Sequence, residues 1–211
     1  MKRNYFVFLL MIGVGFASCN MQDGSGKGMA ISGVVENAND LTAYMDRKNL
    51  DSAIQPITSS EIKSNGEYAL GFSDGLEPGI YRVRIGSESA DIILSGTEKV
   101  IRLNGDINNF SKFDYSITGS PLSEAYRSNI AGLMNKSLTQ QEVDNVILSP
   151  DEDPMLSLAL VLGTAKPNPQ LHAKYSNVLE RLTAKYPDAS ITSQFKNFVG
   201  VMKQEFNKQQ S

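Results

Sequence analysis

Strand-like runs recur about every ten residues from Met29 to Thr118, with turn signals between them. This spacing is typical of an all-β sandwich or barrel. The expected strands are residues 30–36, 41–47, 54–63, 67–72, 79–85, 91–94, 99–103 and 112–118. The segment 79–103 holds three of these runs, and we take it as the centre of a predicted antiparallel sheet region.

The run 80–85 indicates how that region is buried. Arg82 and Arg84 nearly alternate with apolar residues, which is typical of a sheet with one solvent-exposed face and one buried face. We therefore expect the sheet to be covered on one side only. Asn65-Gly66 predicts a hairpin with a type I′ turn, because these residues tolerate the two positive φ values that this turn needs.

The chain after Gly119 is predicted to be helical, because helix start signals recur there. They are Ser120-Pro121, the capping box Thr139-Gln140-Gln141-Glu142, Asp153-Pro154, Asn168-Pro169 and Asp188. Apolar residues follow them at spacings of three and four. The predicted fold class is therefore α+β, with an N-terminal antiparallel β-sandwich at 30–119 and a C-terminal α-helical region at 120–211.

The N-terminus has the pattern of a cleaved export signal. Lys2 and Arg3 precede the uncharged run 5–16, and small residues then lead to Cys19. Twelve helical residues span about 18 Å, which is shorter than the roughly 30 Å hydrocarbon core of a bilayer. A transmembrane anchor is therefore not expected.

The sequence Phe16-Ala17-Ser18-Cys19 resembles the lipobox of bacterial lipoproteins, although Phe16 stands where that motif usually has Leu. The resemblance implies that Cys19 is acylated and becomes the mature N-terminus, and a thiolate is the nucleophile that lipid transfer requires. It predicts a signal peptide at 1–18 and a Gly-rich tether at 19–29. The alternatives are an ordinary secretory signal with a chance cysteine, or a buried apolar strand.

The predicted location is the cell envelope, with the protein lipid-anchored to the outer membrane and facing the periplasm. Asn20 follows the cysteine in place of the Asp that retains some lipoproteins in the inner membrane. The formal net charge is -3 and Lys and Arg do not cluster, which argues against a nucleic-acid-binding protein.

Several kinds of chemistry are excluded or disfavoured by the residues present. The chain has 1 Cys, so an internal disulfide and Cys-x-x-Cys redox chemistry are both excluded. The glycine-rich stretch 24–28 looks like a phosphate loop, but no Ser or Thr follows Lys27. We expect no cofactor.

One enzymatic motif occurs in the sheet region. Gly71-Phe72-Ser73-Asp74-Gly75 matches the G-x-S-x-G nucleophile elbow of hydrolases, which needs a helix directly after the serine. A turn into another strand follows here. His172 is the only histidine, and it is expected in a separate helical layer. We therefore predict that Ser73 is a loop residue.

Two further candidates are a metal site and a modification site. A single histidine cannot build a multi-histidine metal site, whereas Asp151-Glu152-Asp153 could meet a hard cation such as Ca²⁺. A helix-capping role is the simpler account of Asp153. Asp51-Ser52-Ala53 resembles the acceptor pattern for O-glycosylation in Bacteroidetes, which makes Ser52 a candidate for modification.

A series of short motifs gives the sheet region a family resemblance. They are Ile31-Ser32-Gly33-Val34-Val35, Asn65-Gly66-Glu67-Tyr68, Pro78-Gly79-Ile80-Tyr81, Asp91-Ile92-Ile93-Leu94 and Thr118-Gly119-Ser120. Their order resembles the N-terminal domain of unknown function that precedes thioredoxin domains in envelope lipoproteins of Bacteroidetes. Lys185-Tyr186-Pro187 is similar to the helical segment that joins the two domains in that family. The resemblance covers residues 30 to about 200.

The chemistry of that family belongs to a Trp-Cys-x-x-Cys loop in its C-terminal domain. This chain has 0 Trp and 1 Cys, so no catalytic residue carries over. We expect a non-catalytic envelope lipoprotein that acts as a binding or scaffolding module for an envelope protein partner. The alternatives are an accessory partner of a thiol:disulfide oxidoreductase acting in trans, and a small-ligand or glycan-binding lipoprotein.

Overall fold

The computed structural model describes residues 28–50 and 54–211, and its strands precede its helices. Cys19 and Ser52 lie outside the described residues, so both remain predictions. The strands are β1 (Met29–Glu36), β2 (Thr42–Arg47), β3 (Gln55–Glu61), β4 (Glu67–Phe72), β5 (Gly79–Ile85), β6 (Glu88–Leu94), β7 (Val100–Asp106) and β8 (Tyr115–Thr118). The helices are α1 (Pro121–Met134), α2 (Gln140–Leu148), α3 (Pro154–Thr164), α4 (His172–Lys185) and α5 (Ser190–Gln210), and short 3-10 helices are η1 (Ile107–Lys112) and η2 (Pro169–Leu171).

The strands form two four-stranded sheets that pack face to face. The outer sheet has the order β4-β1-β7-β8, and the inner sheet, which faces the helices, has the order β3-β2-β5-β6. Neighbouring strands are antiparallel except β1 and β7, which are parallel. Ile31, Tyr81, Ile92 and Ile101 are almost completely buried between the sheets. The predicted α+β fold class is therefore confirmed, with one parallel pair in the sandwich.

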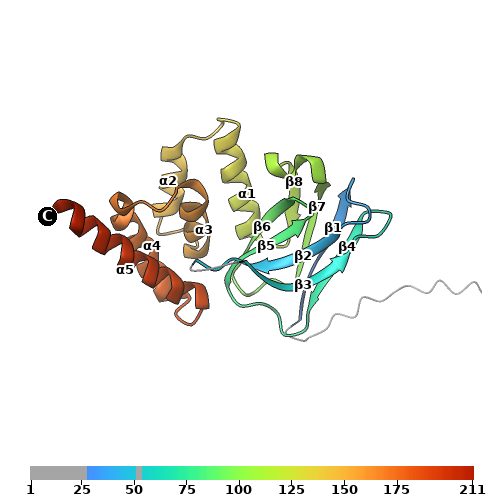
Figure 1. The fold of residues 1–211 in the computed structure, drawn as a ribbon, viewed down its shortest axis with the longest axis horizontal. Coiled ribbons are helices and arrows are strands. Elements are labelled where there is room, and N and C mark those ends of the chain that lie inside the picture. The colour runs from blue at the N-terminus through green and yellow to red at the C-terminus, as the bar shows by residue number, and fades with distance from the viewer. Residues whose placement is uncertain (1–27, 51–53) are drawn as a thin grey trace, which may run out of the picture.

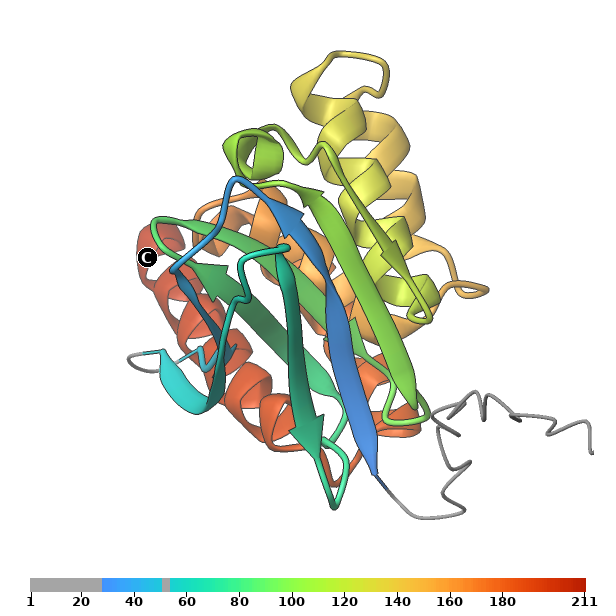
Figure 2. The ribbon, with the colours of Figure 1, turned by 90° about the vertical axis from the view of Figure 1, so that its right-hand side faces the viewer.

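The prediction that the sheet is covered on one side only is wrong for the inner sheet. Tyr81 and Val83 of β5 face the sandwich core, whereas Ile80 of β5 and Ile93 of β6 belong to the helical core. Helices therefore cover the second face of this sheet (Figure 1). The outer sheet has the predicted open face instead, where Val100 is 51% exposed, and no helix lies in front of it (Figure 2).

The predicted type I′ hairpin at Asn65-Gly66 is also wrong. Gly66 has a φ of 81°, but Asn65 is not among the residues with positive φ. The Gly66 N–H donates to the Lys63 carbonyl at 2.8 Å. The two flanking strands belong to different sheets, so this turn carries the chain from the inner sheet to the outer one.

Other element boundaries also differ from the prediction: β6 begins at Glu88 rather than at residue 91, and β7 ends at Asp106 rather than at residue 103. The Asp106 carboxylate accepts from the Asn108 N–H at 3.0 Å and caps η1, which ends at Lys112. Phe113 then has a left-handed φ of 58°, so β8 begins at Tyr115 rather than at residue 112. Asn168 caps η2, and α4 begins only at His172. Ala189, rather than Asp188, is the N-cap of α5, and it makes no side-chain capping bond.

The other predicted helix starts are confirmed. Ser120 and Asp153 each accept a hydrogen bond from a backbone N–H of the following first turn, and Thr139 forms a reciprocal capping box with Glu142. Among the described residues, no helix combines the length and the apolar character that a bilayer crossing needs.

Candidate binding sites at the sandwich–helix junction

The structure does not bring Ser73 and His172 together. Ser73 lies in the turn between β4 and β5, no helix follows it, and its hydroxyl donates to Asp74 at 3.2 Å. His172 begins α4, which belongs to the helical layer (Figure 1). Its ring centroid lies 4.0 Å from that of Phe206. The G-x-S-x-G match is therefore a loop sequence, and His172 is a packing residue.

Asp153 acts as a helix cap, and its oxygens already have donors. One oxygen accepts from the Met155 N–H at 2.8 Å, and the other accepts from Lys185 at 2.6 Å and from Tyr186 at 2.8 Å. Within residues 28–50 and 54–211, no group of three or more His, Cys, Asp or Glu side chains is arranged to hold a metal ion. The capping account of Asp153 is the one that its contacts support.

A large open groove lies where the sandwich meets the helices. It has a volume of about 680 Å³. Its apolar lining includes Val100, Pro121 and Leu122, and its charged lining includes Glu98, Lys99, Asp153 and Lys185. An apolar lining with charges of both signs suits an extended polypeptide segment that buries a side chain and pairs at its polar groups.

One wall of the groove is a rigid turn between β6 and β7. The Glu98 carboxylate accepts from the backbone N–H groups of Ser95, Gly96 and Thr97 at 3.0, 3.0 and 3.1 Å. Gly96 has a φ of 89°, which L side chains rarely adopt. The wall is therefore fixed by its own hydrogen bonds, and a ligand would meet a preformed surface.

The groove lies beside the point at which β1 begins. The Ala30 N–H donates to the carbonyl of Lys99, a groove residue, at 2.8 Å. Figure 2 shows the start of β1 and the β6–β7 connection at the same end of the sandwich. The described part of the chain therefore begins beside this groove.

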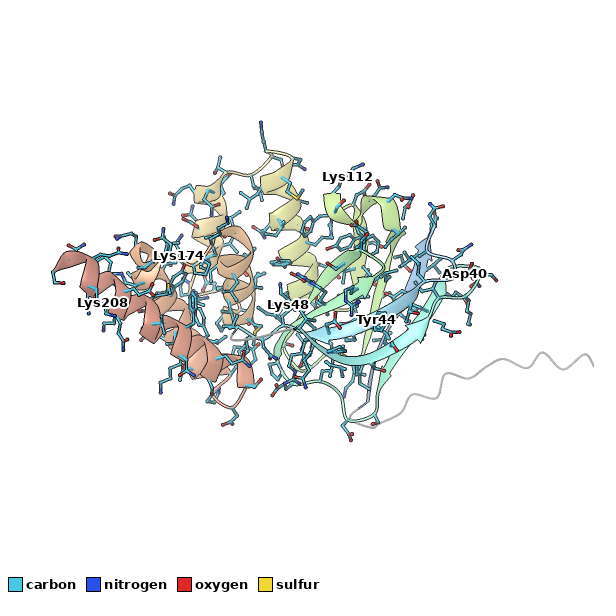
Figure 3. The ribbon with its side chains drawn as sticks, in the orientation of Figure 1. Asp40, Tyr44, Lys48, Lys112, Lys174 and Lys208 are labelled. Atoms are coloured by element: carbon cyan, nitrogen blue, oxygen red, sulfur yellow. The ribbon has the colours of Figure 1, made fainter. Side chains whose placement is uncertain are left out.

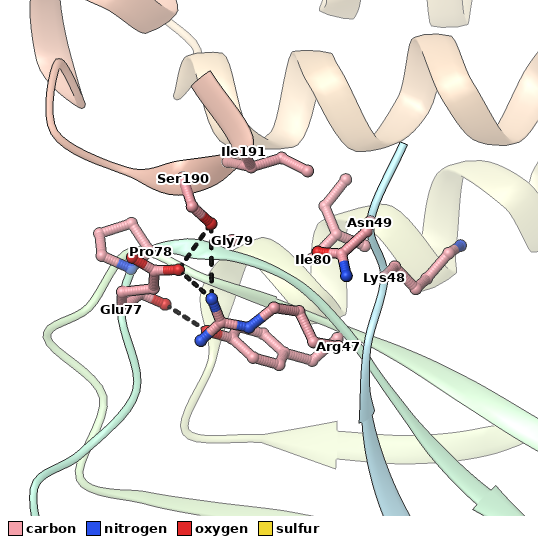
Figure 4. Close-up of a pocket in the computed structure, with 10 residues that line it drawn as sticks. Arg47, Lys48, Asn49, Glu77, Pro78, Gly79, Ile80, Ser190 and Ile191 are labelled. Carbon is pink, nitrogen blue, oxygen red and sulfur yellow. Dashed lines mark hydrogen bonds and ion pairs between the residues drawn. The ribbon is translucent and has the colours of Figure 1, made fainter. Parts of the chain in front are cut away.

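A set of polar contacts among Arg47, Glu77 and Ser190, here called the latch, joins the sandwich to α5. Arg47 of β2 contacts Glu77 of the β4–β5 connection, and the Ser190 hydroxyl of α5 donates to Glu77 at 2.7 Å (Figure 4). The Gln194 side chain also accepts from the Leu50 N–H at 2.8 Å. These bonds and the shared apolar core fix the helices on the sandwich.

A buried charge cluster, which sequence reasoning missed, lies between the inner sheet and the helices. The Asp91 carboxylate is 10% exposed and pairs with Lys48 at 2.8 Å and Arg82 at 2.9 Å. The Tyr126 hydroxyl of α1 donates to Asp91 at 3.4 Å. Burial alone would raise the pKa of Asp91, but the charges of Lys48 and Arg82 outweigh it and hold that pKa below its ordinary value.

This cluster predicts an acid-dependent stability. Because the folded state lowers the pKa of Asp91, its stabilising contribution is complete above the unfolded pKa of about 3.9 and is lost as the pH falls through the lower folded value. Asp91→Asn should lower the free energy of unfolding by about 2 kcal/mol at pH 6. The difference from wild type should shrink towards pH 2.

Urea unfolding at pH 6, 4 and 2 measures this difference. Asp74→Asn, at an exposed loop carboxylate, is the matched control and should track wild type at each pH. An Asp91→Asn deficit that stays constant down to pH 2 would contradict the assigned direction of the shift.

Comparison with protein-family models gives no match for this chain, and no curated protein matches it either. The resemblance to envelope thioredoxin-like lipoproteins therefore stays a prediction.

Proposed function

We propose that this chain is a non-catalytic binding or scaffolding module of the cell envelope, anchored by lipid on Cys19 to the outer membrane and facing the periplasm. The observation that carries the proposal is the preformed groove beside the start of β1. A tether that ends there holds the groove near the membrane. The order of turn motifs shared with the N-terminal domain of envelope thioredoxin-like lipoproteins supports the same assignment.

The length of the tether limits where the groove can work. Residues 19–28 lie between the proposed anchor and the sandwich, and ten extended residues reach about 35 Å at most. The groove therefore stays within about that distance of the bilayer surface. A partner in the same membrane lies within that range.

The proposed partner is an extended segment of another envelope protein. Val100 in the groove is 51% exposed, so it offers apolar surface that is not buried within this chain. Lys99 lies beside it in the groove lining and offers a positive charge to a polar group next to an inserted apolar side chain. The Glu98 and Asp153 carboxylates already accept hydrogen bonds from within the chain.

A photo-crosslinking residue at position 100 tests the groove. In living cells we expect a covalent adduct from position 100 and none from position 201, because Val201 is similarly exposed, at 49%, but lies on α5. Mass spectrometry of the adduct identifies the partner. A Cys-x-x-Cys protein there would favour the accessory redox role, and equal adducts at both positions, or none at either, would overturn the groove as the binding surface.

The lipid anchor is tested separately. Wild type should incorporate radiolabelled palmitate and sediment with membranes, whereas Cys19→Ser should do neither, because the only thiol has been removed. Ser25→Ala in the predicted tether is the control and should behave as wild type. Absence of label from wild type, or label retained by Cys19→Ser, would refute lipidation at this residue.

A further inference from the structure

We propose that a smaller cavity at the junction, distinct from the groove, binds a small monocarboxylate with an apolar body. The cavity has a volume of about 140 Å³ and lies between the inner sheet and helices α1 and α3. Lys48 and Asp91 line its polar end together with Tyr126. Figure 3 shows Lys48 at the boundary between the sandwich and the helices.

The size of the cavity sets the size of the ligand. A protein cavity of about 150 Å³ lined by apolar side chains takes up benzene. Leu50, Ile80, Ala159 and Leu162 provide such a lining here. A ring or a short alkyl chain fills this apolar part, and one polar group can then reach the end of the cavity that holds Lys48.

The charge balance at that end favours an anion. Two cations share the Asp91 carboxylate: Lys48, which lines the cavity, and Arg82, which does not. The cluster as a whole therefore carries one uncompensated positive charge. Asp46 of the neighbouring strand β2 is fully buried. Its carboxylate accepts two hydrogen bonds from Arg84, at 2.8 and 3.3 Å. A cationic ligand would add a third positive charge where water screens poorly.

The hydrogen-bonding capacity of Lys48 and Asp91 also favours an anionic ligand. Both oxygens of Asp91 already accept, from Arg82 on one side and from Lys48 and Tyr126 on the other. The ammonium of Lys48 has three N–H donors, and among the described residues Asp91 is the acceptor it contacts. The donors that remain suit the head group of a carboxylate ligand.

The cavity wall that carries Lys48 is held in place from two directions. The Lys48 N–H donates to the Ile80 carbonyl of β5 at 3.1 Å, and the Leu50 N–H donates to Gln194 of α5 at 2.8 Å. In Figure 4 the Lys48 side chain points away from the Arg47–Glu77–Ser190 latch. The cavity is thus preformed, and little binding free energy is lost in ordering it.

Titration of the full chain in detergent with benzoate, benzamide and benzylamine, followed by NMR of methyl groups, tests the proposal. Benzoate should shift the methyl signals of Ile80 and Ala159 and bind at least about tenfold more tightly than benzamide, since a charge-assisted hydrogen bond contributes about 1.5–3 kcal/mol. Benzylamine should not bind. Butyrate should bind as benzoate does, because its chain also fits the apolar part.

Two variants and one control variant separate a specific site from uptake by the detergent. Lys48→Met should weaken benzoate about tenfold or more and leave benzamide unchanged, whereas Lys63→Met, at an exposed lysine, should change neither. Ala159→Leu fills the cavity and should abolish every shift while the chain stays folded. Equal binding of all three probes, no binding of benzoate, or shifts that survive Ala159→Leu would overturn the proposal.

Discussion

Gly33→Ala is expected to lower the free energy of unfolding by about 3 kcal/mol, the upper end of what overpacking usually costs. A Cβ atom at Gly33 would lie 1.9 Å from the carbonyl oxygen of Leu103 and 2.7 Å from its carbonyl carbon. Both atoms belong to the backbone of β7, so no side chain can rotate out of the way. The methyl group can be accommodated only if the two central strands of the outer sheet separate.

The cause of this close approach is an irregularity between β1 and β7. The parallel pairing runs through Ser32 and resumes at Val35, and it skips the two residues between them. The Val34 N–H donates at 2.8 Å to the side-chain oxygen of Asn104 instead of to a backbone carbonyl. Gly33 lets the backbones come close enough for this substitute bond, so the variant should lose it as well.

Gly71→Ala is the matched control, because Gly71 lies in the neighbouring strand β4 opposite Ala30 of β1. No atom lies within 4 Å of a Cβ placed there. Replacement should stabilise the protein by about 0.5 kcal/mol through a less flexible unfolded chain. Guanidinium unfolding followed by circular dichroism compares the two variants, and similar losses in both would mean that close approach is not the cause.

These two glycines mark the limit of what sequence can predict here. Both glycines occur in segments with a strand-like sequence pattern, and no residue within either segment distinguishes one glycine from the other. The difference depends on β7, which begins at Val100, far from Gly33 in the chain. Strand positions and helix caps were predictable because they depend on neighbouring residues, whereas the division of the strands between two sheets depends on distant partners.

Part of the charge cluster around Asp91 could have been predicted from the sequence. The short turn at Gly86-Ser87 sets the register of β5 and β6 and places Arg82 opposite Asp91. An Arg–Asp pair could have been derived from that register. Lys48 and Tyr126 could not, because they come from a segment after β2 and from α1, and only the packing of the helices on the inner sheet brings them to Asp91.

The start of α1 gives the second large expected effect, because its capping residues also complete an edge strand. The Ile93 N–H of β6 donates to the Ser123 hydroxyl at 2.8 Å, and the Ser120 hydroxyl donates to the Ile93 carbonyl at 2.8 Å. Both serines are fully buried. They take the place of the next strand at Ile93, so the backbone groups of this residue are not available for pairing with another chain.

The double variant Ser120→Ala/Ser123→Ala should lower the free energy of unfolding by about 4 kcal/mol, from a lost cap of about 1 and two orphaned buried backbone groups of about 1–3 each. Thr139→Ala removes the cap of α2, which is exposed, and should cost only about 1 kcal/mol. The excess of the double variant therefore measures the strand-edge bonds. Hydrogen exchange adds a local readout, because Ser123→Ala alone should speed exchange of the Ile93 amide. If the double variant costs no more than Thr139→Ala, the serines act as a cap alone and the edge of β6 is held by packing.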